Sequence, residues 1–215
     1  MIPKIIHQIW IGDKLLSDEH SKFVQMWREM YPDYTHVFWD HGQVEKERIL
    51  PPDKHPYYQS DFYPIALKAD LLRYEIIRKL GGVYIDVDTE PLKRWEDNIL
   101  ERKFFGGIQN NGEVAIGIFG AEPECPLIVD VCNEVVSNIE IQLKRNLPVV
   151  HVDQYTGPAF FDRMCESYKR QNEYTFFPPQ YFYPYWITET HRRHEDFRVT
   201  CPDAYSVHHW TKNWI

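Results

Sequence analysis

The stretch Pro64–Leu92, PIALKADLLRYEIIRKLGGVYIDVDTEPL, predicts a helix, a tight turn and a strand that carries two aspartates. Apolar side chains recur at spacings of three and four, which marks one face of an α-helix. This face comprises Ile65, Ala69, Leu72, Ile76 and Leu80. Gly81 and Gly82 follow, and glycine enters the left-handed geometry of a helix C-cap without a steric penalty. We therefore expect the helix to end at residue 80.

After the two glycines the hydrophobic period changes to two, as in a β-strand. The apolar residues Val83, Ile85 and Val87 alternate with Tyr84, Asp86 and Asp88. Both aspartates should therefore leave the same face near the C-terminal end of the strand, where open α/β sheets bind ligands.

Two carboxylates at one strand end are unfavourable unless something binds them. At a separation of ~6 Å and an effective dielectric constant of ~20, their repulsion is about 3 kcal/mol. A hard divalent cation that bridges to phosphate oxygens would turn this repulsion into attraction. On this reasoning, Asp88→Asn should abolish turnover and leave stability unchanged or slightly raised. A bare D-x-D triplet also occurs where the acids are merely solvated, but the apolar strand after a Gly-Gly turn favours a site.

Composition favours one α/β domain. The 215 residues are 43% hydrophobic and 15% aromatic, which is enough to bury a sizeable core. The formal net charge of −8 argues against a nucleic-acid-binding surface. The four cysteines show no C-x-x-C spacing, so reduced thiols in a cytoplasmic protein are expected. No apolar run is long enough to cross a bilayer, so we expect no integral membrane span and at most peripheral association with a membrane.

Strand and helix signals alternate along the rest of the chain. Residues 4–11 predict a buried opening strand, Ser17 an N-cap for a helix that runs to Met30, and residues 34–39 a second strand. This β-α-β order is typical of nucleotide-binding sheets, yet the chain has neither a G-x-G-x-x-G nor a P-loop motif. Further helices are expected at 43–50, 126–143 and 157–168, strands at 104–108, 114–119 and 149–152, and loops at 51–63 and 176–186.

The segment 204–215, AYSVHHWTKNWI, concentrates polar and aromatic side chains. A histidine in this segment could complete the coordination of a cation held by the aspartates, and Lys212 could contact a diphosphate. The alternative is that Trp210 and Trp214 only pin the segment to the core, while His208 and His209 stay exposed.

Residues 66–92 resemble the DXD region of glycosyltransferase family 32, which includes bacterial capsule and surface-polysaccharide transferases and the yeast initiating α-1,6-mannosyltransferase. They are similar also to the glucosyltransferase domain of the large clostridial toxins. The segments IPKIIHQIWIG, YTGPAFF and HHW…W fit the same family, so the resemblance covers nearly the whole chain.

The resemblance implies a GT-A fold of the α/β class, with a mixed central sheet flanked by helices. It also implies a nucleotide-diphosphate sugar donor, Mn²⁺ or Mg²⁺, and transfer with retention at the anomeric carbon. Residues 1–215 would form a single domain, in which residues 1–92 bind the nucleotide sugar and residues 93–215 form the acceptor half and the tail.

By the same resemblance, two groups of residues would bind the donor. Trp10 would pack on the base, while the backbone around Ile9 and Ile11 would contact the edge of the base. Asp70 and Arg73, three positions apart on one helix face, would hydrogen-bond the hydroxyls of the donor sugar. The alternatives are a core tryptophan and an ordinary surface ion pair, respectively.

The metal site would lie around Val87. Asp88 would bind the metal directly, and Asp86 would lie near the ribose and a metal-bound water. His209 or His208 would supply a further ligand.

The tail would complete the donor site, because Lys212 and Trp214 would close over the diphosphate. The family often has Gly-Ser where this chain has Lys212-Asn213, which leaves the atoms that contact phosphate open. Asp40, after the second strand, is either a turn former or a contact to the base or ribose.

The predicted activity is transfer of a hexose from a uridine donor, or less favoured a guanosine donor, to a glycan, glycoprotein or glycolipid acceptor. The sequence reveals no carboxylate nucleophile. One alternative is a phosphatase of the haloacid-dehalogenase kind, whose D-x-D also follows a strand. Another is a non-catalytic module that binds a sugar nucleotide or a carbohydrate. A calcium-binding EF-hand is excluded, because Glu90-Pro91 stand where that loop requires Asp or Asn and Gly.

Overall fold

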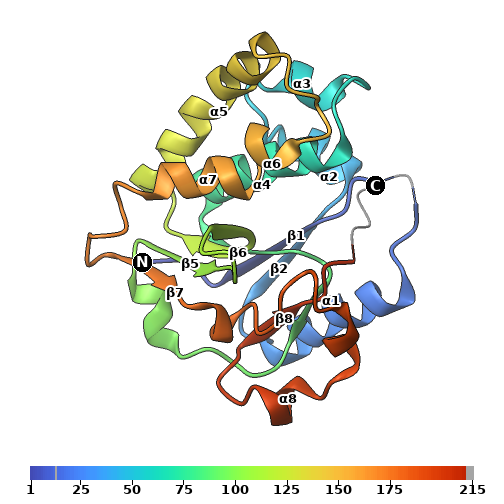
Figure 1. Cartoon of the computed structure of the whole chain (residues 1–215), viewed down its shortest axis with the longest axis vertical. Coiled ribbons are helices and arrows are strands. Elements are labelled where there is room, and N and C mark those ends of the chain that lie inside the picture. Colours follow the sequence, from blue (N-terminus) through green and yellow to red (C-terminus); the bar gives the residue numbers. More distant parts are fainter. Residues whose placement is uncertain (13, 212–215) are drawn as a thin grey trace.

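The chain is built around a six-stranded sheet, shown in Figure 1 as a computed structural model that describes residues 1–12 and 14–211. The strand order is β2-β1-β3-β6-β5-β7. These strands are β1 (Ile5–Ile9), β2 (Thr35–Trp39), β3 (Gly82–Ile85), β5 (Phe104–Ile108), β6 (Val114–Ala121) and β7 (Tyr174–Phe177). Strand β1 pairs in parallel with β2 and β3, whereas β6 is antiparallel to β3 and β5. The expected mixed central sheet is confirmed.

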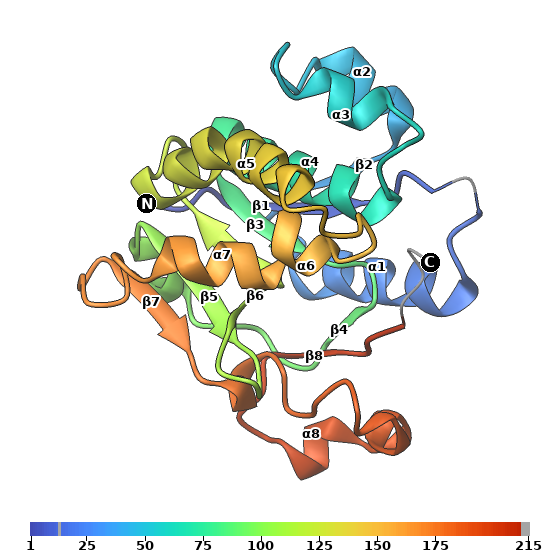
Figure 2. The ribbon, with the colours of Figure 1, turned by 45° about the horizontal axis from the view of Figure 1, so that its top comes forward.

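Helices lie on both sides of this sheet. They are α1 (Asp18–Met30), α2 (His41–Glu47), α3 (His55–Gln59), α4 (Ile65–Leu80), α5 (Pro126–Lys144), α6 (Val152–Tyr155), α7 (Pro158–Cys165) and α8 (Phe197–Thr200). Short 3-10 helices occupy Asp97–Glu101, Pro179–Tyr181 and Thr190–His194. Figures 1 and 2 show α4, α5 and α7 on one side and α1 on the other. Each side has its own cluster of buried apolar residues.

Helix α4 and the turn after it follow the sequence prediction closely. The helix runs from Ile65 to Leu80, and the Gly81 N–H bonds to the Ile77 carbonyl at 2.9 Å. Gly81 has φ +62° but ψ −158°, so the cap is not the left-handed helical cap that we expected. Gly82 has φ +94°, and a Cβ there would lie 2.7 Å from the Ile5 carbonyl oxygen. Glycine is needed at both positions, because side chains rarely adopt these backbone angles.

The strand after the glycines is shorter than predicted. β3 ends at Ile85, and the chain turns at Asp86–Asp88, where the Thr89 N–H bonds to the Asp86 carbonyl at 3.1 Å. The Asp86 N–H still bonds to the Gly117 carbonyl of β6 at 2.7 Å, which anchors the start of the turn. The aspartates therefore lie on a turn at the C-terminal end of β3 and do not alternate along a pleated strand.

A second, two-stranded sheet follows this turn. β4 (Thr89–Pro91) pairs antiparallel with β8 (Ser206–His208), with Thr89 opposite His208. Figure 2 shows β4 and β8 side by side below the central sheet. The pairing brings the segment after residue 205 to the predicted metal site.

Three other predictions were wrong. Residues 149–151 form no strand but a turn that leads into α6, and the expected loop 51–63 contains α3. The aromatic segment 176–186 begins inside β7, which pairs in parallel with β5. The helix predicted at 43–50 begins earlier, at His41, because Asp40 caps it by accepting the Gln43 N–H at 2.8 Å. Tertiary pairing and capping override local pattern at these places.

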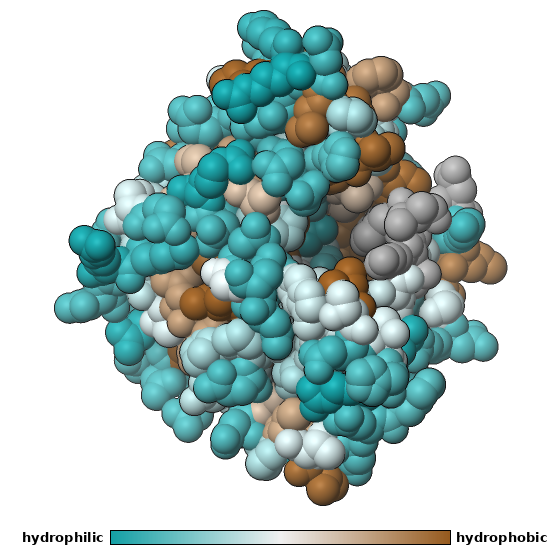
Figure 3. All heavy atoms as spheres, in the orientation of Figure 1, coloured by the Kyte–Doolittle hydropathy of each residue, from teal (hydrophilic) through white to brown (hydrophobic). Residues whose placement is uncertain are grey.

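The face of the molecule in Figure 3 is mainly hydrophilic, with apolar residues in separate spots. Large apolar side chains that stay exposed lie far apart along the sequence, as Leu15, Phe62 and Val199 do. Among residues 1–12 and 14–211, the helices are all too short or too polar to cross a bilayer.

Candidate active site

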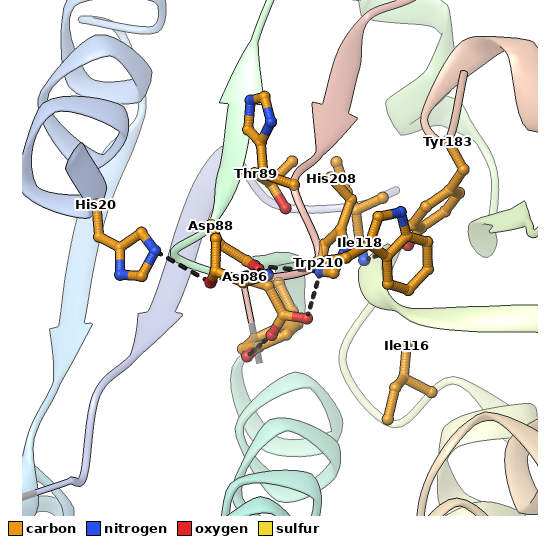
Figure 4. A network of polar contacts seen from close by, with 12 residues as sticks. His20, Asp86, Asp88, Thr89, Ile116, Ile118, Tyr183, His208 and Trp210 are labelled. Atoms are coloured by element: carbon orange, nitrogen blue, oxygen red, sulfur yellow. Dashed lines mark hydrogen bonds and ion pairs between the residues drawn. The ribbon is translucent and has the colours of Figure 1, made fainter. Parts of the chain in front are cut away.

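Asp86, Asp88 and His208 come together at the end of β3. Each offers one ligand atom, and these atoms lie within 4.8 Å of one another. Figure 4 shows the two aspartates on the turn and His208 reaching them from β8. The histidine is 122 positions from Asp86, so only the β4–β8 pairing places it there.

Asp88 is nearly buried and has partners on both carboxylate oxygens. Its Oδ1 lies 3.1 Å from His208 Nε2. Its Oδ2 accepts from the Thr211 N–H at 2.9 Å and from Thr211 Oγ1 at 3.0 Å. Burial alone would raise the pKa of Asp88, but the neighbouring imidazole and these donors hold it well below its usual value. Asp88 is therefore ionised at neutral pH.

Asp86 is held from the opposite side. Its Oδ1 accepts from the Tyr84 hydroxyl at 2.6 Å and from the Arg73 guanidinium at 3.2 Å, and its Oδ2 lies 3.3 Å from His208 Nε2. The Arg73 guanidinium also lies over the Tyr84 ring, 4.5 Å from its centroid. A Cβ on Gly117 would lie 2.9 Å from Asp86 Oδ2. Because Gly117 has no side chain, the backbone of β6 can lie close to this carboxylate.

Asp70 and Arg73 form a buried ion pair of 3.2 Å, each with 3% of its surface exposed. The alternative of a surface ion pair is therefore wrong. Asp70 Oδ2 also accepts from the Thr156 hydroxyl at 2.7 Å, and Arg73 donates to the Ile116 carbonyl at 2.8 Å. Burial raises the pKa of Asp70 to about 6, while Arg73 and Thr156 oppose the rise. Arg73 thus links the predicted sugar-binding pair to Asp86.

His208 contacts both carboxylates, with its Nε2 3.3 Å from Asp86 Oδ2 and 3.1 Å from Asp88 Oδ1. Burial disfavours its imidazolium form, yet the two aspartates raise the pKa of His208 to about 10. The Trp210 ring packs edge-on against it at 4.3 Å, with φ +53° at Trp210. Both carboxylates already interact with a positive charge here. A cation that takes the place of the imidazolium proton would meet two carboxylates and the neutral imidazole nitrogen of His208, so the residues fit a divalent cation.

His209, the other predicted ligand, points elsewhere. Its Nε2 lies 3.1 Å from Glu90 Oε2, and its ring stacks on Phe23 at 5.1 Å between centroids. Among the described residues, the group that could hold a metal ion consists of Asp86, Asp88 and His208, and His209 is not part of it. His208 is therefore the histidine that the structure brings to the aspartates.

The residues predicted to bind the base lie at the end of β1. Ile9 and Ile11 are buried, and Trp10 is partly exposed. The Trp10 indole N–H donates to the Lys14 carbonyl at 2.7 Å, and its ring meets His20 edge-on at 6.1 Å. Trp10 is therefore not a core tryptophan.

A cavity of about 810 Å³ opens beside this strand end. It is lined by Ile11, His41, Tyr58, Tyr63, Ile65 and Lys68 among others. Asp40, which precedes His41, acts as the N-cap of α2. Lys212 and Trp214 lie outside the described residues.

Sequence reasoning missed three residues of the site. Tyr84 bonds Asp86, Thr156 bonds Asp70, and Thr211 bonds Asp88. Tyr84 was on the predicted face with the aspartates, and Thr211 directly follows the HHW motif, so both signals were available. Thr156 lies 86 positions from its partner, and no spacing in the sequence points to it.

Residues 17–105, about two-fifths of the chain, match the family described as glycosyltransferase sugar-binding region containing DXD motif. The matched region includes α4, the Gly-Gly turn and both aspartates. The resemblance predicted from the sequence is thereby confirmed.

Relatives from fungi extend the likeness beyond this region. A mannosyl phosphorylinositol ceramide synthase of Saccharomyces cerevisiae is 28% identical over 79% of this chain and 44% of its own length. The initiation-specific alpha-1,6-mannosyltransferase of Candida albicans is 34% identical over 58% of this chain and 34% of its own length. The chain thus spans less than half the length of these two relatives.

Solved structures share the fold. PaToxG glycosyltransferase superposes with a TM-score of 0.63 at 20% identity, covering 78% of this chain and 69% of that protein. The UDP-bound glycosyltransferase domain of the YGT toxin gives 0.56 at 12% identity, covering 81% and 79%. These likenesses confirm the GT-A fold and the predicted relation to toxin glycosyltransferase domains at the level of fold.

Proposed function

We propose that this chain is a metal-dependent, retaining glycosyltransferase that moves a hexose from a nucleoside-diphosphate sugar to a hydroxyl group. The acceptor would be a glycan, glycoprotein or glycolipid. The observation that carries the proposal is the convergence of Asp86, Asp88 and His208 in a GT-A fold, on the turn that closes the DXD region.

Asp86, Asp88 and His208 would hold the divalent cation, Mn²⁺ or Mg²⁺. A bound cation of this kind neutralises charge that develops on a leaving diphosphate. The protein contributes fixed ligand positions, because Tyr84 and Arg73 restrain Asp86 while Thr211 restrains Asp88.

Asp70 and Arg73 would orient the donor sugar. They are connected to the metal-binding carboxylates through the contact between Arg73 and Asp86. Arg73 Nε is buried without a hydrogen-bond partner among the described residues, and a sugar hydroxyl would supply one. The short chain of ion pairs would thus fix the sugar relative to its diphosphate.

The donor base would occupy the cavity that Ile11 lines, next to Trp10 in the sequence. Tyr58 and Tyr63 line this cavity, and tyrosine rings suit stacking with a planar base. The polar groups that line this cavity do not choose between bases, so the uridine donor rests on the family resemblance. A uridine donor also matches the ligand named for the YGT toxin domain.

A thermal-shift screen tests the proposal directly. UDP-glucose, UDP-galactose and GDP-mannose are added with MnCl₂ or with EDTA, because a ligand that binds only the folded state raises its melting temperature. We expect one donor to raise the melting temperature in MnCl₂ and to have a much smaller effect in EDTA. No shift with any donor in MnCl₂ would contradict the proposal.

Slow hydrolysis of the stabilising donor separates a transferase from a binding module. A transferase releases some free sugar to water, whereas a binding module releases none. Asp88→Asn should abolish the release, and Asp203→Asn, which changes an exposed carboxylate away from the site, should preserve it. Release that survives Asp88→Asn would contradict the role of the DXD aspartates.

A further inference from the structure

Thr211 connects the DXD aspartates to a histidine on the other side of the site. Its N–H and its hydroxyl both contact Asp88 Oδ2, at 2.9 and 3.0 Å. The same hydroxyl lies 3.1 Å from Nε2 of His20, a residue of α1 that is 1% exposed. Figure 4 shows His20 facing this part of the site from the α1 side.

The direction of these hydrogen bonds follows from their chemistry. An ionised carboxylate only accepts hydrogen bonds, so the single hydroxyl proton of Thr211 goes to Asp88. The hydroxyl oxygen then accepts from His20, which requires the His20 Nε2 to carry a proton. His20 donates to Thr211, and Thr211 donates to Asp88.

In this arrangement the two Asp88 carboxylate oxygens have different partners. Oδ2 is occupied by Thr211, and Oδ1 faces His208 Nε2 at 3.1 Å. With Oδ2 held by two donors, the carboxylate cannot rotate without losing both bonds. Oδ1 is therefore presented to the space shared by Asp86 and His208.

We infer that Thr211 and His20 are positioning residues that hold Asp88 in the orientation required for binding a divalent cation. This inference rests on the metal site in the proposed function. Partners of this kind orient metal ligands, and their loss lowers metal affinity by roughly 10- to 100-fold. Among the described residues, neither belongs to the group that could hold a metal ion, so both would act through the Asp88 carboxylate.

The competing interpretation is that these bonds only fasten residues 209–211 to α1. Both interpretations predict some loss of stability when the bonds are removed. They differ in metal affinity, because a fastening role leaves the orientation of Asp88 unchanged once the protein is folded.

The experiment measures binding of MnCl₂ alone to the full chain, by isothermal titration calorimetry and by the loss of the free Mn²⁺ signal in electron paramagnetic resonance. Thr211→Val removes the hydroxyl, keeps the shape and keeps the backbone N–H bond to Asp88. We expect it to weaken Mn²⁺ binding about tenfold. Thr211→Ser restores the hydroxyl and should bind Mn²⁺ within about twofold of the unmodified chain.

Thr200→Val is the matched control. Within residues 1–12 and 14–211, the Thr200 hydroxyl contacts Glu195, Asp196 and Cys201, all on α8 or its flanks. Its removal should therefore leave Mn²⁺ affinity unchanged. Circular dichroism of each variant checks that it is folded.

A double-mutant cycle tests whether His20 acts on Asp88 through Thr211. His20→Phe keeps a ring beside Trp10 and removes the donor to Thr211, so it should weaken Mn²⁺ binding several-fold. In the Thr211→Val background it should have little further effect, because its route to Asp88 is already lost. Equal effects in both backgrounds would overturn the proposed route from His20 through Thr211.

The outcomes separate this inference from the proposed function. If the unmodified chain binds no Mn²⁺, the metal site itself is wrong, and the inference falls with it. If the unmodified chain binds Mn²⁺ and Thr211→Val binds it equally well, the positioning role is wrong while the metal site stands.

Discussion

Replacing Asp88 by asparagine should destabilise the metal-free protein, which is the opposite of what the sequence suggested. From sequence alone, the mutation only removes a repulsion between two aspartates. In the structure, His208 Nε2 lies 3.1 Å from Asp88 Oδ1 and has its pKa raised to about 10, so it is charged at neutral pH. The mutation therefore removes an attraction as well.

The distances decide which effect is larger. At an effective dielectric constant of ~20, a charge pair 3.1 Å apart gains about 5 kcal/mol. Two aspartate oxygens that lie within 4.8 Å of each other lose at least about 3.5 kcal/mol. Weaker bonds from Thr211 to a neutral amide add about 1 kcal/mol to the loss. We expect Asp88→Asn to lower the free energy of unfolding by up to about 3 kcal/mol.

Urea unfolding at pH 7 in EDTA, followed by circular dichroism, measures this difference. Asp203→Asn, on the exposed surface, should change the free energy of unfolding by less than about 0.5 kcal/mol. Adding MnCl₂ should widen the gap, because only the unmodified chain gains strongly from the cation. An Asp88→Asn variant that equals or exceeds the unmodified chain in stability in EDTA would refute the assigned charge balance.

Three further predictions concern the scaffold. Glu75→Gln removes the closer and fully buried partner of the Lys54 ammonium, 2.8 Å away, and leaves the more exposed Asp53 carboxylate at 3.6 Å. The free energy of unfolding in urea should therefore fall by about 2 to 3 kcal/mol, and a loss below about 1 kcal/mol would contradict this. Gly82→Ala places a Cβ 2.7 Å from the Ile5 carbonyl oxygen, whereas Gly112→Ala, at a similar φ of +91°, places its Cβ in open space. The melting temperature of Gly82→Ala should therefore lie well below that of Gly112→Ala. Equal melting temperatures would show that the close approach is unimportant. Burial raises the pKa of Asp70 from 3.8 to about 6, so its protonation stabilises the folded chain below about pH 4, and this contribution is lost as the pH rises through 6. Asp70→Asn should flatten the stability curve between these pH values in urea unfolding, and an unchanged slope would count against the shifted pKa.

The sequence predicted elements that rest on local periodicity. Helix α4 was placed to the residue, and α1 was placed with its Ser17 cap, because both have a regular apolar face and a clear terminal signal. β7 and β8 were missed, because each is three or four residues long and exists only through pairing with a distant strand. Local pattern carries no information about such pairing.

The candidate site, like the fold, could be predicted only in part from the sequence. Asp86 and Asp88 could be found from the strand signal before them, although the turn that carries them was not foreseen. The choice between His208 and His209 depends on the register of β4 with β8, where Thr89 stands opposite His208. A shift of one residue would exchange the two side chains between opposite faces. Sequence reasoning could therefore name the pair of histidines but not the one that meets the aspartates.

The two-stranded sheet of β4 and β8 makes the site a late product of folding. Its nitrogen ligand and its carboxylates are separated by 122 positions, and contacts of such long range form slowly, because a large loop must close first. A nascent chain that has already built β1 to β3 would hold both acids but lack the imidazole. Tight capture of Mn²⁺ should thus report that the distant segment has docked, so the ion can serve as a probe of complete folding in refolding experiments.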